Sequence, residues 1–158
     1  MNKLPFISVV SLNWNSQKDI FRLLKSIRNS DYPKSRYEVI VVDNGSTDGS
    51  IEKIKKYFPR TKIIALKTNL GVWARNYAFK KVKGEIIVTL DSDAVLPGKN
   101  TLTRVVERLL RDPRIGILGV KVINKGTKIP EFSPMKLNFY TGIISTLNPE
   151  KQTTKTTW

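Results

Sequence analysis

Short apolar runs alternate along this chain with longer amphipathic stretches, and this alternation limits the possible fold more than any other feature. The runs are rich in Ile, Val and Leu, have the length of strands, and mostly lead into polar or glycine-containing turns. Between them, apolar residues recur at intervals of three and four, as they do in helices. Such an order is typical of a parallel sheet covered by helices. The sequence therefore predicts an α/β fold: an open, mostly parallel, doubly wound sheet with helices on both faces.

The periodicity also places the individual elements. We expect strands at residues 6–12, 38–42, 63–66 and 115–123, and another that starts at residue 85 and carries Asp91 and Asp93 at its carboxyl end. Helices are expected from Ser16, where Asp19 three residues later suggests a cap, from Ser46 or Thr47 to 58, and over 71–82 and 101–111. The residues expected to face the core from these helices are Ile20, Leu23, Leu24, Ile27, Ile51, Ile54, Phe58, Ala74, Tyr77, Ala78, Val82, Leu102, Val105, Val106, Leu109 and Leu110.

Acidic side chains follow two of the predicted strands. Asp91 and Asp93 end one apolar run, and Asp43 and Asp48 flank the turn after another. In α/β sheets, ligands bind at the carboxyl ends of strands. Residues two apart in an extended segment project from the same face, so Asp91 and Asp93 could share one divalent cation or one polyphosphate. The alternative is a surface pair in which Asp93 only helps to begin the next segment.

Composition excludes several kinds of chemistry. The 158 residues include neither Cys nor His, which rules out thiol nucleophiles, imidazole bases, disulfides and zinc-finger sites. This length fits one domain, and no signal peptide or membrane span is expected, because the apolar runs are short. In residues 124–158 the periodicity fails, and threonines and prolines accumulate. The aromatic residues there either cover the ligand edge of the sheet or fasten a tail to the core.

The chain is strongly basic. Its net charge is +15, from 28 Lys and Arg against 13 Asp and Glu, and residues 60–83 contain no acid. Such a charge attracts nucleic acid, anionic lipid or phosphorylated ligands without choosing among them. The plainer interpretation of residues 60–83 is a solvated basic helix face.

The common phosphate-binding loops are absent. Neither a Gly-x-x-x-x-Gly-Lys-Ser/Thr loop nor a Gly-x-Gly-x-x-Gly turn occurs after the first strand, so a phosphorylated ligand needs another anchor. Two aspartates holding Mg²⁺ or Mn²⁺ provide one, because the cation bridges and neutralises a diphosphate.

Four segments together resemble the family 2 glycosyltransferases with the GT-A fold, a Rossmann-like fold for nucleoside-diphosphate sugars. These segments are residues 7–15, 39–49, 69–76 and 84–93, and the match in order and spacing extends over about residues 5–123. The Asp-Asn-Gly-Ser-Thr-Asp turn makes the chain most similar to the rhamnosyltransferase-like members. The resemblance implies a nucleotide-sugar-binding core at 1–123, with 124–158 an abbreviated acceptor-side segment or tail of the same domain.

The resemblance also implies roles for individual residues. Leu12 and Trp14 would border the nucleobase, Asp43 and Asn44 would contact base or ribose, Arg75 would lie near the nucleotide, Asp91 would approach the ribose or the metal shell, and Asp93 would ligate Mn²⁺ or Mg²⁺. Many relatives have a second aspartate in place of Asn44. An amide donates as well as accepts hydrogen bonds, so the base preference stays open.

The implied reaction moves a sugar from a nucleoside-diphosphate sugar to an acceptor hydroxyl with inversion at the anomeric carbon. Such an attack normally uses a carboxylate as general base. No acid here matches the acidic motif that supplies this base in the family, so the general base is unassigned. The acids after Asp93 are Glu107, Asp112, Glu131 and Glu150. Two alternatives stay open: an inactive or truncated nucleotide-sugar-binding module, and a basic nucleic-acid-binding protein.

The expected partners follow from this interpretation. They are a UDP, GDP or dTDP sugar, a glycan or lipid-linked acceptor, and either a second copy or another protein that completes the acceptor side. Nucleic acid is disfavoured, because no recognised nucleic-acid module is present. A cytoplasmic location is expected, with peripheral contact between the basic surface and the anionic inner face of the membrane.

Overall fold

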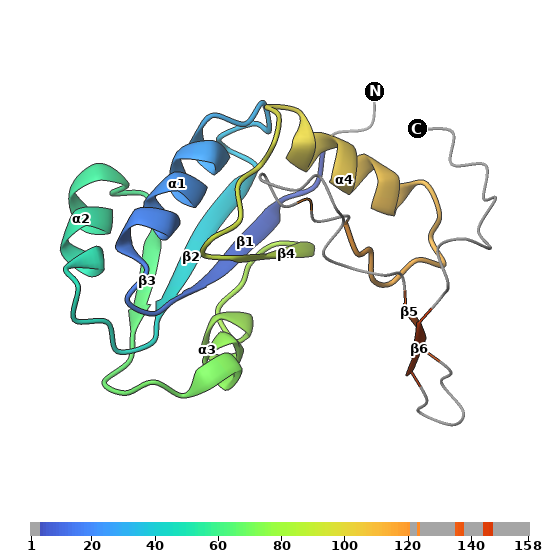
Figure 1. Cartoon of the computed structure of the whole chain (residues 1–158). Coiled ribbons are helices and arrows are strands. Elements are labelled where there is room, and N and C mark those ends of the chain that lie inside the picture. Colours follow the sequence, from blue (N-terminus) through green and yellow to red (C-terminus); the bar gives the residue numbers. More distant parts are fainter. Residues whose placement is uncertain (1–3, 121–122, 124–134, 138–143, 147–158) are drawn as a thin grey trace. The chain divides into compact units, whose positions relative to one another are not determined.

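The computed structural model describes residues 4–120, 123, 135–137 and 144–146 (Figure 1). The chain forms two compact units, Met1–Gly116 and Ile117–Trp158. The second unit contains an antiparallel pair of short strands, β5 (Met135–Leu137) and β6 (Ile144–Thr146). The functional division predicted at residue 123 is a separate matter and stays a prediction.

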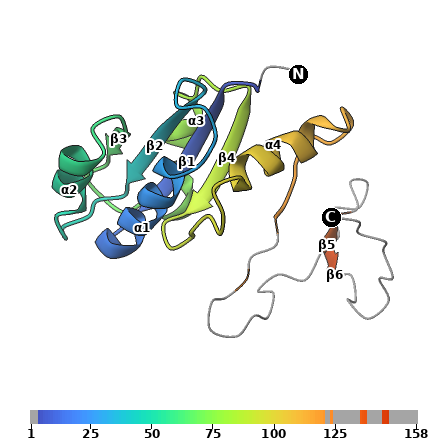
Figure 2. The same ribbon diagram turned by 90° about the horizontal axis from the view of Figure 1, so that it is seen from above.

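Four parallel strands form the sheet of the first unit, in the order β3-β2-β1-β4 (Figure 2). Their bounds are Ile7–Asn13 for β1, Tyr37–Asp43 for β2, Lys62–Ala65 for β3 and Ile86–Asp91 for β4. After β3 the chain returns past β2 and β1 to add β4 on the far side of β1. The direction of winding therefore reverses between β1 and β4, which is where open α/β sheets bind their ligands.

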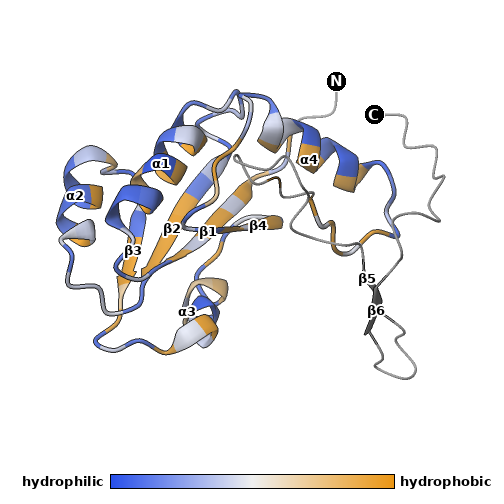
Figure 3. Cartoon of the chain, in the orientation of Figure 1, coloured by the Kyte–Doolittle hydropathy of each residue, from blue (hydrophilic) through white to orange (hydrophobic). Residues whose placement is uncertain are grey.

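Helices cover both faces of this sheet, as predicted (Figure 1). One face packs against α1 (Gln17–Arg28), α2 (Ser50–Tyr57) and α4 (Thr101–Leu110). The other face packs against a 3₁₀ turn, η1 (Gly71–Ala74), and the short helix α3 (Arg75–Phe79). Figure 3 shows the apolar sides of the helices turned toward the strands. The predicted α/β fold class is confirmed.

Alternation along the central strands sends side chains to both layers. Val9 and Val41 belong to the cluster with α1, and Val10 and Val42 to the cluster with α3. The four predicted core residues of α1 are all buried. Burying an aliphatic side chain of this size stabilises the fold by roughly 1.5–3 kcal/mol, so α1 is held mainly by its apolar stripe.

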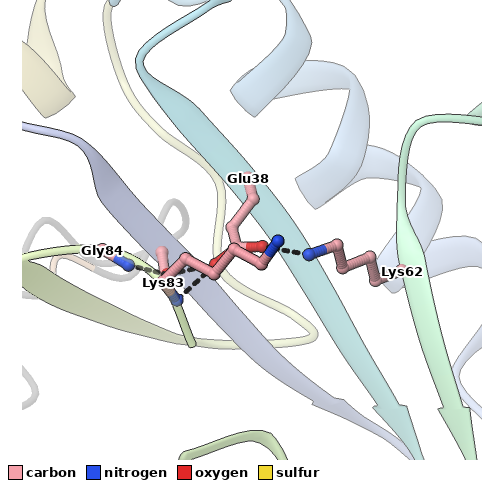
Figure 4. A network of polar contacts seen from close by, with 5 residues as sticks. Glu38, Lys62, Lys83 and Gly84 are labelled. Carbon is pink, nitrogen blue, oxygen red and sulfur yellow. Dashed lines mark hydrogen bonds and ion pairs between the residues drawn. The ribbon is translucent and has the colours of Figure 1, made fainter. Parts of the chain in front are cut away.

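A polar network joins the amino-terminal halves of three strands to the turn before β4 (Figure 4). The Glu38 carboxylate accepts hydrogen bonds from Ser8 Oγ at 2.6 Å, Lys62 Nζ at 2.6 Å and the Lys83 backbone N–H at 2.7 Å. The Gly84 N–H donates to Ser8 Oγ at 2.9 Å. Burial raises the pKa of Glu38, but these hydrogen bonds outweigh burial and the net pKa is lowered.

Some element predictions were wrong. The helix expected over 71–82 is only η1 and α3, in which Ala74 and Ala78 face the sheet and Tyr77 is exposed. Leu110 is also exposed, because α4 ends at that residue. The helix expected from Ser46 or Thr47 begins later, at Ser50, since the preceding residues form a turn.

The fifth strand was also wrong over its described part. Residues 115–120 form no strand, and Ile123 forms an isolated bridge. Ile117 is 92% exposed. An apolar run becomes a strand only when a neighbouring strand completes its backbone hydrogen bonds. Residues 121 and 122 lie outside the described part. None of the helices in the described part of the chain has the length and apolar character needed to cross a membrane.

Candidate functional site

A pocket of about 380 Å³ opens at the carboxyl ends of β1 and β4, where the winding of the sheet reverses. Its lining comes from three regions: the end of β1 and the start of α1, the η1–α3 segment, and the turn after β4. The lining residues are Leu12, Trp14, Ser16, Asp19, Val72, Arg75, Asp91, Ser92 and Asp93. Five of the predicted site residues are therefore brought together in one pocket.

Strand register explains why residues distant in sequence meet here. Leu12 of β1 pairs with Asp91 of β4, so the two strands end at the same level. The chain turns sharply after β1, and Asn15 adopts a φ of 46°, a conformation that Asn tolerates better than most residues. Trp14 leaves the sheet in this turn and is 54% exposed. Its indole is thus available as an apolar wall for a flat ligand group.

Asp91 and Asp93 both line the pocket, but not in the extended conformation that we expected. Strand β4 ends at Asp91, and the Ala94 N–H donates to the Asp91 carbonyl at 3.0 Å. This hydrogen bond closes a turn that contains Asp93. Both carboxylates are exposed to solvent, so neither bears the cost of burying an uncompensated charge.

Arg75 faces Asp91 across the pocket. The two side chains form an ion pair, in which Arg75 is 27% and Asp91 73% exposed. The neighbouring Ala74 is fully buried against the sheet and anchors the start of α3. The Arg75 Nε is buried without a hydrogen-bond partner among the described residues. One N–H of this guanidinium thus has no protein acceptor there.

Asp43 and Asn44 lie at the end of β2, outside the pocket lining, and both are buried. Asp43 accepts hydrogen bonds from Asn13 Nδ2 at 2.8 Å and from the Ser46 N–H at 2.9 Å. Asn44 binds residues 69–71. In the structure these two side chains support the loops around the pocket. Their predicted contact with base or ribose stays a prediction.

The turn after β2 also caps α1. The Asp48 carboxylate accepts hydrogen bonds from the Gln17 N–H at 2.8 Å and the Ser50 N–H at 3.0 Å. Burial raises the pKa of Asp48, but hydrogen bonds from Ser50 and Gln17 outweigh it and lower the pKa. The predicted cap residue, Ser16, occupies the N-cap position but makes no capping hydrogen bond with its side chain. Asp48, from a distant turn, instead accepts from the first N–H of α1, that of Gln17.

Four lining residues were not identified from the sequence: Ser16, Asp19, Val72 and Ser92. Ser16, the N-cap of α1, and Asp19, in its first turn, come soon after β1. Their position as polar residues after a strand is a sequence signal that points to the ligand edge of the sheet. They were instead assigned only to helix capping. Asp19 also forms an ion pair with Arg22, which does not line the pocket.

A divalent cation fits the donor set only in part. The described residues contain no cluster of three or more Asp, Glu, His or Cys side chains that could hold a metal ion. Asp91 and Asp93 still offer two hard oxygen donors. Mg²⁺ is often bound by one or two carboxylates, with the remaining positions taken by water and substrate phosphate. The donor set thus fits a cation that is held jointly with a diphosphate.

No general base emerges from the candidate acids. Glu107 is exposed on α4, Asp112 binds Arg114, and neither lines the pocket. Glu131 and Glu150 lie outside the described residues.

Comparison with known proteins supports one family. The sequence profile of Glycosyl transferase family 2 matches residues 8–155. The poly(ribitol-phosphate) beta-N-acetylglucosaminyltransferase TarS of Staphylococcus aureus is 33% identical over 154 residues, which cover 91% of this chain and 26% of TarS. A dolichyl N-acetyl-alpha-D-glucosaminyl phosphate 3-beta-D-2,3-diacetamido-2,3-dideoxy-beta-D-glucuronosyltransferase of Methanococcus voltae is 30% identical over 131 residues, covering 77% of this chain and 40% of the relative.

Solved structures show the same similarity. The mannosyltransferase PcManGT of Pyrobaculum calidifontis, in complex with GDP-Man and Mn²⁺, matches with a TM-score of 0.67 and 31% identity over 73% of this chain and 35% of PcManGT. TarS 1-349 in complex with UDP-GlcNAc matches with a TM-score of 0.61 and 35% identity over 67% of this chain and 31% of that chain. This chain thus spans well under half the length of these relatives.

Proposed function

The chain belongs to glycosyltransferase family 2, and we propose that it uses the pocket between β1 and β4 to bind a nucleoside-diphosphate sugar and transfer the sugar to an acceptor hydroxyl with inversion. The observation that carries this proposal is the meeting of Trp14, Arg75, Asp91 and Asp93 in one pocket at the switch point of the sheet. The Trp14 indole offers an apolar wall for a nucleobase, and the Arg75 guanidinium can pair with a diphosphate. The Asp91 and Asp93 carboxylates can hold the metal ion that accompanies the diphosphate.

The donor would lie with its base toward Leu12 and Trp14 and its diphosphate toward Arg75 and the turn after β4. Arg75 can bind phosphate oxygens through two parallel N–H groups. The structural relatives support this class of ligand, since PcManGT is in complex with GDP-Man and TarS with UDP-GlcNAc. The two nucleotides differ, so the base that this chain selects is left to experiment.

Asp93 and Asp91 would hold a Mn²⁺ or Mg²⁺ ion together with the diphosphate. When bound, the cation neutralises charge that develops on the leaving diphosphate. PcManGT is in complex with Mn²⁺. Asp91 already forms an ion pair with Arg75, so the Asp91 carboxylate can either bind the metal ion or stay paired with Arg75.

For the acceptor we propose a glycan polymer or a lipid-linked sugar. The two relatives described above are named for a poly(ribitol-phosphate) and a dolichyl-linked substrate. Of the acids after Asp93, the two that the structure describes, Glu107 and Asp112, do not line the pocket. A completing partner or an acceptor-side segment would therefore supply the general base.

We further propose peripheral contact with an anionic membrane surface, where a lipid-linked acceptor would be found. Between Lys53 and Gly84 the sequence contains no acid, and Lys80, Lys81 and Lys83, which lie together between α3 and β4, are exposed. A surface of this charge gains roughly 1 kcal/mol per basic residue close to an anionic bilayer. Co-sedimentation with vesicles containing phosphatidylserine at low salt tests this contact, and no binding would remove it.

The decisive experiment is a thermal-shift screen with UDP, GDP, dTDP and their sugar conjugates, with and without Mn²⁺. Asp93→Asn removes one pocket carboxylate, and Glu107→Gln removes one exposed carboxylate of α4 as a matched control. A ligand at one hundred times its Kd stabilises the folded state by about 2.7 kcal/mol. We expect one nucleotide to raise the Tm by several degrees in the wild type and the control but not in Asp93→Asn. No shift with any nucleotide would overturn the donor site.

An inactive module with the same pocket is the alternative. Measuring slow hydrolysis of the stabilising sugar nucleotide in Mn²⁺ separates the two. Hydrolysis that Asp93→Asn abolishes supports the enzyme, whereas tight binding with no turnover toward any acceptor favours the inactive module.

A further inference from the structure

The side chain of Asn44 holds residues 69–71 against the end of β2. Asn44 is 1% exposed. Its Nδ2 donates to Asn69 Oδ1 at 2.6 Å and to the Gly71 carbonyl at 3.1 Å, and its Oδ1 accepts from the Leu70 N–H at 2.9 Å. Both amide hydrogens and the oxygen of Asn44 are thus used within the protein.

Backbone groups fix the orientation of both amides. A backbone N–H can only donate and a carbonyl can only accept, so Leu70 and Gly71 determine which end of the Asn44 amide is oxygen. The Gly71 N–H donates to Asn69 Oδ1 at 2.8 Å, which determines the orientation of Asn69 in the same way. Position 44 therefore needs a donor, whereas Asn69 acts in these contacts only as an acceptor.

The held segment leads directly into the pocket wall. Gly71 has a φ of +59° and starts η1, followed by Val72 and Arg75, which both line the pocket. Apolar packing holds this segment weakly: Leu70 is 41%, Val72 70% and Trp73 74% exposed. Ala74 is buried, but the part of the segment that precedes it is thus held in place mainly by the hydrogen bonds of Asn44 and Asn69.

We propose that Asn44 is a positioning residue: it holds residues 69–71 in place and thereby sets where Val72 and Arg75 stand at the donor pocket. Its effect on ligand binding rests on the proposed function, whereas its effect on the segment does not. An aspartate at this position would lose both donated hydrogen bonds and place a carboxylate against two oxygen acceptors. The asparagines at 44 and 69 are therefore a matched donor and acceptor.

Replacing asparagine with aspartate should have opposite effects at the two ends of the Asn44–Asn69 hydrogen bond. Asn44→Asp removes the donor, while Asn69→Asp keeps the accepting oxygen. Hydrogen–deuterium exchange at the Leu70 and Gly71 amides reports on the segment without any ligand. We expect exchange to rise roughly tenfold or more in Asn44→Asp and to stay within about twofold of wild type in Asn69→Asp, since a lost hydrogen bond to a buried group favours local opening.

A second variant covers the case in which Asn44→Asp does not fold. Asn69 is exposed, so Asn69→Ala leaves the core intact, and it removes the acceptor. The Gly71 amide should then exchange roughly tenfold faster, again in contrast to Asn69→Asp. Asn29→Asp, at an exposed position outside the contacts, is the control for the added charge.

Nucleotide affinity completes the experiment, using whichever nucleotide raises the Tm of the wild type. Affinity should fall in Asn44→Asp and Asn69→Ala, each by roughly tenfold, and be kept in Asn69→Asp. The proposal is overturned if exchange at 70–71 is unchanged in both disrupting variants. It is also overturned if affinity falls in Asn44→Asp while exchange does not change, because Asn44 would then contact the ligand itself. A wild type that binds no nucleotide contradicts the proposed function, while the exchange pattern still decides whether Asn44 holds the segment.

Discussion

Arg75 forms an ion pair with Asp91 across the pocket, and this pair connects the start of α3 to the end of β4. The Asp91 side chain is 73% exposed, so water screens the interaction. Exposed pairs of this kind contribute about 0–1 kcal/mol to stability. A ligand that needs either charge can therefore separate the two side chains at small cost.

Replacing Arg75 with Met should weaken nucleotide binding far more than it weakens the fold. The aliphatic stem is largely retained, so we expect the free energy of unfolding to change by about 1 kcal/mol or less. Loss of charged hydrogen bonds to phosphate should lower nucleotide affinity roughly tenfold or more. Denaturation in guanidinium chloride measures the free energy of unfolding, and calorimetric titration measures the nucleotide affinity. The control is Arg104→Met on an exposed face of α4, and unchanged affinity in Arg75→Met would remove Arg75 from the donor site.

Glu38→Gln should destabilise the protein in a pH-dependent way. The pKa of Glu38 is lowered in the folded state, so its carboxylate stabilises the fold above the ordinary pKa of 4.5, and this stability is lost as pH falls through the folded-state pKa. Hydrogen bonds to a charged group contribute about 1.5–3 kcal/mol. We expect a loss of that order for Glu38→Gln at pH 7, and a smaller difference from wild type at pH 3. A difference that is the same at both pH values would contradict the role of the charge.

Gly84→Ala should be strongly destabilising for a steric reason. A Cβ at Gly84 would lie 2.4 Å from the Ser8 backbone nitrogen and 2.6 Å from the Ile7 carbonyl carbon, neither of which can rotate away. Overpacking of this kind costs about 1–3 kcal/mol or more. At Gly116 an added Cβ meets no described atom within 4 Å, so Gly116→Ala should change the free energy of unfolding by about 0.5 kcal/mol or less. If chemical denaturation shows that Gly84→Ala and Gly116→Ala change the free energy of unfolding equally, β1 and residue 84 do not approach each other closely.

Asp48→Ala should loosen the start of α1. The variant loses the hydrogen bonds to the Gln17 and Ser50 N–H groups, and loss of a cap costs about 0.5–2 kcal/mol. Because the pKa of Asp48 is lowered in the folded state, its carboxylate stabilises the fold at pH values above the ordinary carboxyl pKa. This stabilisation is lost as the pH falls into the acid range. Hydrogen exchange at residues 17–19 is the local measurement. Ser16→Ala is the contrasting change, since the Ser16 side chain makes no capping hydrogen bond, and a larger effect there would contradict the assignment of Asp48 as the cap.

The sequence was sufficient to predict the parallel core and the place of Asp91 and Asp93 for one physical reason, whereas Leu12, Trp14 and Arg75 were assigned to the site from the family resemblance. Strands β1 and β2 are mostly buried apolar runs, β4 is an apolar run that alternates half-buried and exposed residues, and all three end at polar residues, so their limits are visible without coordinates. Parallel strand ends lie at one edge of a sheet, and that is enough to bring Leu12, Asp91 and Asp93 together.

What the sequence could not show depends on contacts between distant segments. Asn44 looks like a ligand-binding residue in its turn, and only the position of Leu70 and Gly71 shows that its amide is already used. Likewise, residues 115–120 have the composition of a strand but form none, since pairing is a property of two segments. Cap assignment failed in the same way, because Asp48 lies far from α1 in sequence.

Strand β1 lies between β2 and β4, and its pairing with β4 is the longest-range pairing of the sheet. Closing a long loop is slow relative to forming local contacts. A chain leaving the ribosome can therefore join β1, α1, β2, α2 and β3 before the residues that complete the pocket have been synthesised. The part of the hydrophobic layer that α1 and α2 contribute would form first, and the proposed ability to hold a sugar nucleotide would arise only after β4 is in place.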